Sequence, residues 1–399
     1  MNEPFLSAVP IIKQLENSGF QAYFVGGSVR DYLLNRSISD VDIATSATPN
    51  EVKEIFPRTV DIGIEHGTVL VLFQNKSYEI TTFRTEGEYQ DYRRPKEVSF
   101  IRNLNDDLKR RDFTMNAIAM DRNGKIIDPY NGSAAIRNKV IETVGSANER
   151  FQEDALRIMR AVRFVSQLSF AIEEETLQAI AKLVPLLKNI AVERIRAEFE
   201  KLLVGENGNT AIRLLLDTHL YVYLPGLKNH RNSLERFISF SFKGLNKIEI
   251  WSLLLFTLNL KDKSIEVFLR AWKLPVKEIK EIQQILSYLE KRMEQEWPIY
   301  DLYSAGRAAL SSTEKLYGVL KGLPENDSLL KWLRIYDELP IKDRNDINVT
   351  GRDIMEWFQT EGGPWLRDTL LKVECAILAG DIQNDKEKIK EWLIRCSQK

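Results

Sequence analysis

Short apolar runs alternate with helical patterns over residues 1–145 of the chain. The apolar runs predict β-strands over residues 22–25, 41–45, 66–73, 78–83, 116–120 and 125–128. Apolar positions at helical spacing predict helices over residues 27–34, 50–55 and 104–111. Residues 84–100 are polar and lack a period, which predicts a long loop of the kind that is functional or disordered in compact domains.

Beyond residue 145, helical periodicity continues to the C-terminus. Glycine and proline interrupt it at Gly205–Gly208, Pro225–Gly226, Pro275, Pro298, Pro324 and Pro340. The sequence of this part has no strand pattern, no repeat of fixed period and no low-complexity tract. The whole pattern predicts an α+β head followed by an all-helical remainder.

Composition is that of an ordinary globular protein, with 399 residues, 44% hydrophobic and 28% charged. No apolar run reaches the roughly 18 residues of a transmembrane helix. The N-terminal stretch has an amphipathic helical pattern without the basic start of a signal peptide. We therefore expect a cytoplasmic protein that makes no membrane contact.

The small numbers of cysteines and histidines limit the kinds of catalytic mechanism that the chain can support. Two cysteines, Cys375 and Cys396, form no CxxC motif, which argues against a disulfide framework or a zinc site. With only three histidines, carboxylates, arginines and lysines must carry most of any mechanism. The net charge of −1 gives no global indication of nucleic-acid binding, although a local basic groove would suffice for transient contact with RNA.

Asp40 and Asp42 lie two residues apart at the start of the strand predicted from the apolar run over residues 41–45. Period-two alternation places both carboxylates on one face and the apolar Val41 and Ile43 on the other. Such a pair can hold Mg²⁺, whose other positions are filled by water and substrate phosphates. Two solvated carboxylates on an exposed face are the alternative.

The glycines Gly26 and Gly27 end the first predicted strand and open a helix. A turn without Cβ atoms lets a phosphate approach backbone N–H groups, and Arg30 on the first helical turn could reach the same anion. A plain strand–helix turn with a surface arginine is the alternative. The combination of Gly-Gly, Arg-Asp and the later Asp-x-Asp is more specific than any part alone.

These motifs resemble the class II tRNA nucleotidyltransferases, the family of CCA-adding enzymes and bacterial poly(A) polymerases, whose head is similar to DNA polymerase β. GGSVRD and DVDIAT are followed in order by RRDFTMNA (110–117), IDPYNG (127–132), EDALRIMRAVRF (153–164) and AVERIRAEFEKLL (191–203). The resemblance covers residues 23–203. The remaining C-terminal residues share with the family only their helical character and their length. It implies a polymerase-β-like nucleotidyltransferase head with a mixed sheet over residues 1–145, and an all-α neck, body and tRNA-binding tail over residues 146–205, 206–300 and 301–399.

The motif EDALRIMRAVRF predicts one amphipathic helix. In such a helix Asp154 and Arg157 are neighbours at i and i+3, and a surface ion pair is the simple reading. The resemblance implies instead that they select the base. Cytosine and adenine each present an amino donor beside a ring-nitrogen acceptor, which match Asp154 and Arg157, whereas uracil and guanine reverse this order and leave charged groups unsatisfied.

Further site residues follow mainly from the resemblance. Arg160 and Arg163 would hold the triphosphate or the helix, and Arg111 and Asp112 would contact the nucleotide sugar. Glu79, which shares a strand face with Thr81, is the candidate third carboxylate, with an ordinary outward polar residue as the alternative. The segment EGEYQDYRRP resembles the flexible loop needed to add the terminal A.

The leading prediction is template-independent addition and repair of the 3′-terminal CCA of tRNA from CTP and ATP, with Mg²⁺ and release of pyrophosphate. The expected partner is the 3′ end and acceptor stem of tRNA, and a homodimer stays open. A poly(A) polymerase, a CC-only or A-only enzyme, a non-catalytic RNA-binding protein and a nucleotide-binding helical scaffold are the alternatives. The motif AVERIRAEFEKLL is predicted to be a bracing helix with core residues Ile195, Phe199 and Leu202, and without chemistry.

Overall fold

The computed structural model describes residues 1–87, 89–90, 94–95, 98–324 and 327–397. The chain divides into two compact units. Unit 1 comprises residues 1–238 and 271–273, and unit 2 comprises residues 239–270 together with residues 274 to the C-terminus.

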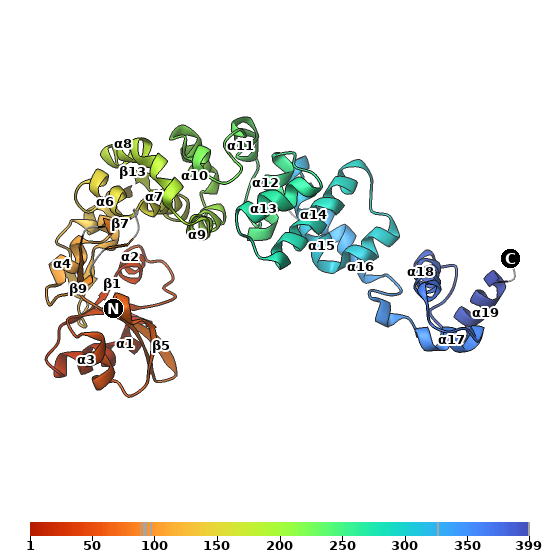
Figure 1. Cartoon of the computed structure of the whole chain (residues 1–399), viewed down its shortest axis with the longest axis horizontal. Coiled ribbons are helices and arrows are strands. Elements are labelled where there is room, and N and C mark those ends of the chain that lie inside the picture. Colours follow the sequence, from red (N-terminus) through yellow and green to blue (C-terminus); the bar gives the residue numbers. More distant parts are fainter. Residues whose placement is uncertain (88, 91–93, 96–97, 325–326, 398–399) are drawn as a thin grey trace. The chain divides into compact units, whose positions relative to one another are not determined.

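Unit 1 is built on a seven-stranded mixed sheet with the strand order β11-β10-β1-β2-β5-β4-β3. Figure 1 labels β1 and β5 of this sheet and the helices α1, α2 and α3 of the same unit. Its strands are β1 (Ala22–Val25), β2 (Asp42–Thr45), β3 (Thr59–Gly63), β4 (Thr68–Phe73), β5 (Lys76–Thr82), β10 (Ala119–Met120) and β11 (Ile126–Ile127). Strands β2 and β5 pair in parallel, and the other neighbours pair antiparallel.

The helices of unit 1 cover the sheet and continue beyond it. They are α1 (Phe5–Asn17), α2 (Gly27–Leu33), α3 (Pro49–Ile55), α4 (Leu104–Lys109), α5 (Gly132–Asn138), α6 (Ala147–Glu153), α7 (Leu156–Leu168), α8 (Glu174–Leu183), α9 (Val192–Leu203), α10 (Gly208–Asp217) and α11 (Arg231–Phe237). Helices α1 and α3 pack on one face of the sheet, where Val69, Val71 and Ile80 are fully buried. Leu104 and Leu108 of α4 pack on part of the opposite face.

Local sequence accounts for several of these boundaries. Helix α3 begins with Pro49 behind a capping box in which Thr48 and Glu51 satisfy each other's backbone N–H groups. Strand β1 and the helix boundaries of α2 and α3 lie within two residues of the predicted ones, because apolar spacing and turn residues act locally.

Some predictions were wrong. Strand β3 was missed although Val60 and Ile62 alternate with Thr59 and Asp61. The run is short and lies at the sheet edge, where both apolar side chains are exposed. Only residues 119–120 of the predicted strand 116–120 pair in the sheet, and a 3₁₀ turn over Thr114–Asn116 precedes them. Beyond residue 145, Ala171–Ile172 (β13) pairs in parallel with Val140–Ile141 (β12).

The predicted long loop contains two short strand pairs. They are formed by β6 (Arg84–Glu86) with β9 (Val98–Phe100), and by β7 (Tyr89–Gln90) with β8 (Arg94–Pro95). Residues 88, 91–93 and 96–97 lie outside the described residues, so the prediction for the segment EGEYQDYRRP concerns residues that are only partly described.

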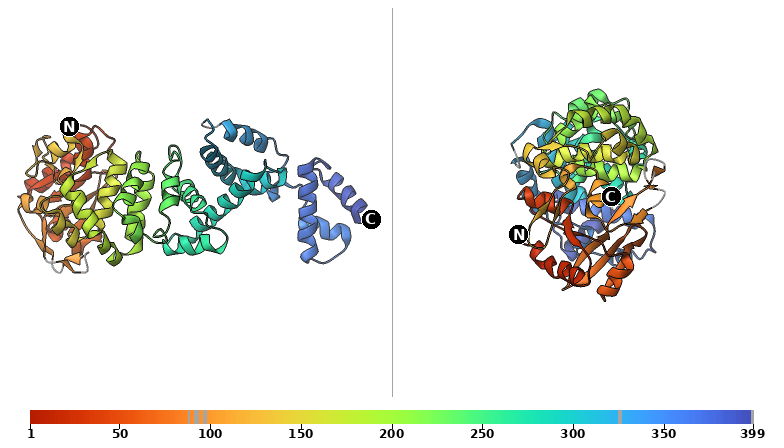
Figure 2. Two further views of the ribbon diagram at one scale, coloured as in Figure 1. Left: turned by 90° about the horizontal axis from the view of Figure 1, so that it is seen from above. Right: turned by 90° about the vertical axis from the view of Figure 1, so that its left-hand side faces the viewer.

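Helices joined by loops form unit 2, and its described residues contain no strand (Figure 2). Its helices are α12 (Lys247–Thr257), α13 (Lys263–Ala271, whose last residue belongs to unit 1), α14 (Val276–Glu294), α15 (Ile299–Lys321), α16 (Asp327–Asp337), α17 (Gly351–Phe358), α18 (Pro364–Ala379) and α19 (Lys386–Ser397). The buried Glu314 accepts hydrogen bonds from Arg292 and from the Trp297 indole, each at 2.6 Å. In the described part of the chain, no helix is long and apolar enough to cross a membrane.

Candidate active site

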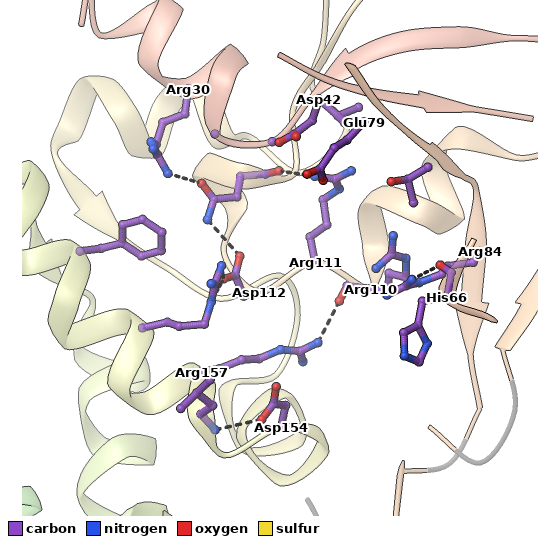
Figure 3. Close-up of a pocket in the computed structure, with 18 of the residues that line it drawn as sticks. Arg30, Asp42, His66, Glu79, Arg84, Arg110, Arg111, Asp112, Asp154 and Arg157 are labelled. Atoms are coloured by element: carbon purple, nitrogen blue, oxygen red, sulfur yellow. Dashed lines mark hydrogen bonds and ion pairs between the residues drawn. The ribbon is translucent and has the colours of Figure 1, made fainter. Parts of the chain in front are cut away.

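A cavity of about 1090 Å³ opens in unit 1 where the sheet meets α7 and α9 (Figure 3). Eleven of the twelve predicted site residues line it: Gly26, Gly27, Arg30, Asp42, Glu79, Arg111, Asp112, Asp154, Arg157, Arg160 and Arg163. They come from segments that are far apart in sequence, so the fold gathers them around one space. Asp40 is the predicted residue that does not line the cavity.

Two carboxylates, Asp42 and Glu79, stand side by side at the edge of the cavity. The parallel register of β2 and β5 places them directly opposite each other, on one face of the sheet. Thr81 also lines the cavity, as its predicted position on the same face requires. The prediction that Asp40 shares the strand with Asp42 was wrong, because β2 begins at Asp42 and Asp40 is an exposed residue before it.

The electrostatics of this carboxylate pair favour a bound cation. Burial of the carboxylate, followed by the negative charge of Glu79, raises the pKa of Asp42. The Asp42 side chain nevertheless remains accessible to solvent, because it lines the open cavity. Arg111 offsets part of the repulsion between the carboxylates and Asp40 adds to it.

Gly26 allows the first strand to pass close to this pair. Its φ of +71° lies in the left-handed region that side chains disfavour. A Cβ atom there would lie 3.1 Å from Nη1 of Arg111 and 3.6 Å from Oδ2 of Asp42. The glycine is therefore required both by the backbone conformation and by the space beside the carboxylates.

A group of arginines surrounds Phe164 on one side of the cavity. The guanidinium carbons of Arg30, Arg160 and Arg163 lie 5.1, 5.7 and 4.1 Å from the centre of the Phe164 ring. Burial lowers the pKa of Arg163 to about 10, although the neighbouring Glu198 opposes this shift. Guanidinium groups are cationic donors, so this wall suits a polyanion such as a triphosphate.

Asp112 organises part of this wall. One carboxylate oxygen accepts hydrogen bonds from the Phe113 N–H at 2.8 Å and the Asn116 amide at 3.0 Å. The other pairs with Arg160 at 2.6 Å. Burial acts to raise the pKa of Asp112, but Arg160 and these hydrogen bonds outweigh it and hold the pKa well below its usual range. The carboxylate is thus ionised and already well supplied with donors.

The predicted continuous helix over residues 153–164 is interrupted at Asp154. Helix α6 ends at Glu153 and α7 begins at Leu156, and between them Asp154 has extended backbone angles. Asp154 and Arg157 do not pair with each other: Asp154 binds Arg194 at 2.8 Å, and Arg157 binds Glu153. Both side chains nevertheless line the cavity, at the end away from Asp42 and Glu79 (Figure 3).

Sequence reasoning missed several residues of the site. Arg194 lines the cavity and Glu198 pairs with Arg163 at 2.8 Å, although the helix that carries both, α9, was predicted to have no chemistry. Asn116 receives a hydrogen bond from Arg30 at 2.8 Å. The charged residues that alternate with apolar ones along α9 could have indicated that this helix contributes to the site. Charges that become buried are usually paired with other charges, so such residues have partners elsewhere in the fold.

The donor set fits a hard divalent cation that substrate oxygens complete. Across the described residues, no three histidine, cysteine or acidic side chains form a metal cage. A pair of carboxylates beside a cationic wall matches Mg²⁺, which usually takes one or two protein carboxylates together with phosphates and water. The cavity therefore offers carboxylates at one end, arginines for phosphates, and a polar pair at the other end.

Three family models match the chain. "Poly A polymerase head domain" matches residues 22–142, "Probable RNA and SrmB- binding site of polymerase A" matches residues 169–230, and "tRNA nucleotidyltransferase domain 2 putative" matches residues 242–393.

Similar proteins span the whole chain. The CCA-adding enzyme of Listeria monocytogenes serotype 4b (strain CLIP80459) is 49% identical over 98% of this chain and 99% of its own. That of Geobacillus sp. (strain WCH70) is 48% identical over 99% of this chain and 98% of its own. The structure of the Bacillus stearothermophilus CCA-adding enzyme in complex with CTP is 45% identical, with a TM-score of 0.92 over 100% of this chain and 98% of that one.

Proposed function

Since the chain belongs to the family of CCA-adding enzymes, we propose that its cavity binds CTP and ATP and adds the 3′-terminal CCA of tRNA without a template. The observation that carries this proposal is the gathering of the predicted nucleotide-binding residues around one cavity in unit 1. The tRNA 3′-hydroxyl attacks the α-phosphate, a new O–P bond forms, and the bond to the leaving pyrophosphate breaks. The hydroxyl proton is released in the same step.

The arginines are proposed to bind and orient the triphosphate. Arg30, Arg160 and Arg163 form one cationic wall, and Asp112 and Glu198 hold two of them in place. The backbone at Gly26 and Gly27 borders the same space. Because the phosphates carry several negative charges, preorganised guanidinium groups reduce the reorganisation needed when charge moves onto the leaving group.

The sugar is proposed to lie near Arg111 and Asp112, in the middle of the cavity. Asp112 already accepts hydrogen bonds from Phe113, Asn116 and Arg160, so a ribose hydroxyl would have to share or displace one of these donors. Arg111 is held by Asp107 at 3.3 Å and points toward Asp42 (Figure 3).

Asp154 and Arg157 are proposed to read the base by hydrogen bonding. Asp154 would accept from the amino group of cytosine or adenine, and Arg157 would donate to the adjacent ring nitrogen. Each has a second partner that limits its movement: Arg194 for Asp154, and Glu153 for Arg157. A base with reversed donors and acceptors would leave a charged group without a partner, which costs about 1–3 kcal/mol or more.

Enzymes of this family use divalent metal ions, and we propose Mg²⁺ here. Asp42 would hold it together with Asp40, which does not line the cavity but whose negative charge acts on Asp42 from the segment before β2. Glu79, beside Asp42, would be the third carboxylate of the site. A bound divalent cation would supply activation of the attacking hydroxyl and neutralisation of charge on the phosphates. The protein's own part is to keep Asp42 beside Glu79 through strand pairing and to keep the triphosphate against the arginines.

The organisation into a head over residues 1–145, a neck over 146–205, a body over 206–300 and a tRNA-binding tail over 301–399 is part of the proposal. So are a cytoplasmic location and a role of the segment EGEYQDYRRP in adding the terminal A. Relatives that match over the full length favour CCA addition over the poly(A) polymerase alternative, with which the chain shares a head domain model.

The test is extension of a tRNA transcript that lacks its last three nucleotides, with Mg²⁺ and with CTP and ATP supplied separately and together. We expect products that stop after two added nucleotides with CTP alone and after three with both, and no extension after chelation with EDTA. Long tails with ATP alone would instead support a poly(A) polymerase. No extension in the presence of Mg²⁺ would overturn the catalytic proposal.

A further inference from the structure

A row of apolar side chains, exposed at Val60 and Leu72 and half-buried at Leu70, continues the sheet face that carries Asp42 and Glu79. Glu79 lies opposite Leu70 of β4, and Leu70 lies opposite Val60 of β3. Residues directly opposite one another share a face, so Asp42, Glu79, Leu70 and Val60 form one line across four strands. Leu72 lies two residues beyond Leu70 on the same face. We call Val60, Leu70 and Leu72 the apolar shelf.

The shelf is open to solvent although its residues are apolar. Val60 and Leu72 are each 45% exposed, whereas Val69 and Val71, which point to the opposite face, are fully buried. Helices α1 and α3 account for that buried face. A contiguous apolar surface that borders a reaction site indicates contact with a partner, because solvent exposure of such a surface is unfavourable.

The direction of the reaction tells which partner fits. The attacking and leaving oxygens of a phosphoryl transfer lie roughly in line, on opposite sides of the phosphorus. The arginine wall lies on the side of β1, α2 and α7, and the shelf lies beyond Glu79 on the side of β4 and β3. If the pyrophosphate leaves toward the arginines, the attacking 3′-hydroxyl approaches across β5 and β4.

We infer that the apolar shelf binds the sugar and base faces of the last nucleotides of the tRNA acceptor end. This inference rests on the proposed function. Val60 lies three strand spacings from Asp42, about 14 Å, and Leu72 is a diagonal neighbour of Glu79 at about 8 Å. These lengths suit one or two nucleotides of a single strand that ends at the carboxylates.

A positive charge lies beside the shelf, where the RNA backbone would pass. Arg58 is exposed, and its carbonyl accepts a hydrogen bond from the Leu72 N–H at 2.9 Å, which fixes it next to Leu72. The shelf thus combines apolar contact for nucleosides with a cation for phosphate. Its side chains are aliphatic, so they would contact a nucleoside through apolar area, without the aromatic stacking of many single-strand binders.

The experiment measures KM for a tRNA transcript lacking its last three nucleotides, and KM for CTP, in Leu72→Asp. We expect KM for tRNA to rise at least about tenfold, because a lost contact with a nucleoside and a new negative charge near phosphates both oppose binding. KM for CTP should stay within about twofold, since Leu72 does not line the nucleotide cavity.

Leu6→Asp is the matched control, since Leu6 is 50% exposed on α1, which packs on the opposite face of the sheet. It should behave as the wild type. Equal KM values for tRNA in Leu72→Asp and Leu6→Asp would overturn the inference, whereas failure of the wild type to add any nucleotide would overturn the proposed function itself.

A photocrosslink avoids dependence on one variant. Benzoylphenylalanine at position 72 should crosslink to the last nucleotides of a 3′-labelled tRNA, and the same group at position 6 should not. Crosslinking at position 72 no stronger than at position 6 would also overturn the inference.

Discussion

Replacing Arg194 with glutamine should weaken base selection while the head stays folded. The Arg194 guanidinium donates to both carboxylate oxygens of Asp154, at 3.4 and 2.8 Å. Without it, the Leu156 N–H at 3.1 Å is the donor to that carboxylate that remains among the described residues. The side chain proposed to accept from the base amino group would then no longer be held in one orientation.

The size of the effect follows from the geometry of the ion pair. Two unit charges about 4 Å apart interact by about 4 kcal/mol at an effective dielectric constant of about 20. The side chains of Arg194 and Asp154 keep 28% and 17% of their exposure, so solvent screens the pair. Exposed pairs contribute up to about 1 kcal/mol, so we expect a loss of about 1–2 kcal/mol, or about 5- to 30-fold in kcat/KM for CTP.

The assay is single-turnover addition of the first nucleotide to a tRNA lacking its last three, with CTP and with UTP. Arg194→Gln should lower kcat/KM for CTP much more than for UTP. Arg194→Lys should retain part of the preference, since it keeps the charge but loses the bidentate geometry. Lys201→Gln, an exposed change on the same helix α9, is the control and should match the wild type. An unchanged ratio of CTP to UTP in folded Arg194→Gln would refute this reasoning.

Three further predictions concern the turn at Gly26, the buried Asp112 and the ion pair of Glu314 in unit 2. Gly26→Ala should lower kcat/KM at least about tenfold, as measured by single-turnover rates. A φ of +71° disfavours alanine by roughly 1–2 kcal/mol, and the new methyl group would lie 3.1 Å from Arg111. The pKa of Asp112 is lowered in the folded state, so its contribution to stability is present above about pH 4 and is lost as the pH falls through the folded pKa. Urea unfolding should accordingly show Asp112→Asn to be less stable than the wild type at pH 7, with a smaller difference at pH 3. Glu314→Ala leaves the buried Arg292 without its carboxylate and should cost about 3–5 kcal/mol by urea unfolding, whereas Glu314→Gln should cost less.

The sequence was most informative where structure is local. The turn at Gly26 and the strand and helix on either side of it were predictable, because glycine conformation and apolar spacing depend on neighbouring residues. The shared strand face of Glu79 and Thr81 followed from alternation alone. That β5 is the strand paired with β2, which sets Glu79 beside Asp42, depends on long-range pairing and could not be predicted from spacing.

At Asp154 the sequence misled in two ways: it predicted one continuous helix, and it suggested Arg157 as the ion-pair partner. The helical periodicity of residues 153–164 continues through the break, because α6 ends at Glu153 and α7 begins only three residues later, at Leu156. The preference of aspartate for positions at helix starts was the available indication, and Asp154 does accept the Leu156 N–H. Its partner Arg194 lies 40 residues away, so the ion pair needs the tertiary fold.

The measurement that tests the central claim most directly uses the triphosphate of a cytidine analogue lacking the 4-amino group. If Asp154 reads that amino group, the wild type should use this analogue about 10- to 100-fold less efficiently than CTP, the range expected for a hydrogen bond to a charged group. Asp154→Ala should show little preference between the two. A preference for CTP that persists undiminished in Asp154→Ala would contradict the account, because another group would then be reading the base.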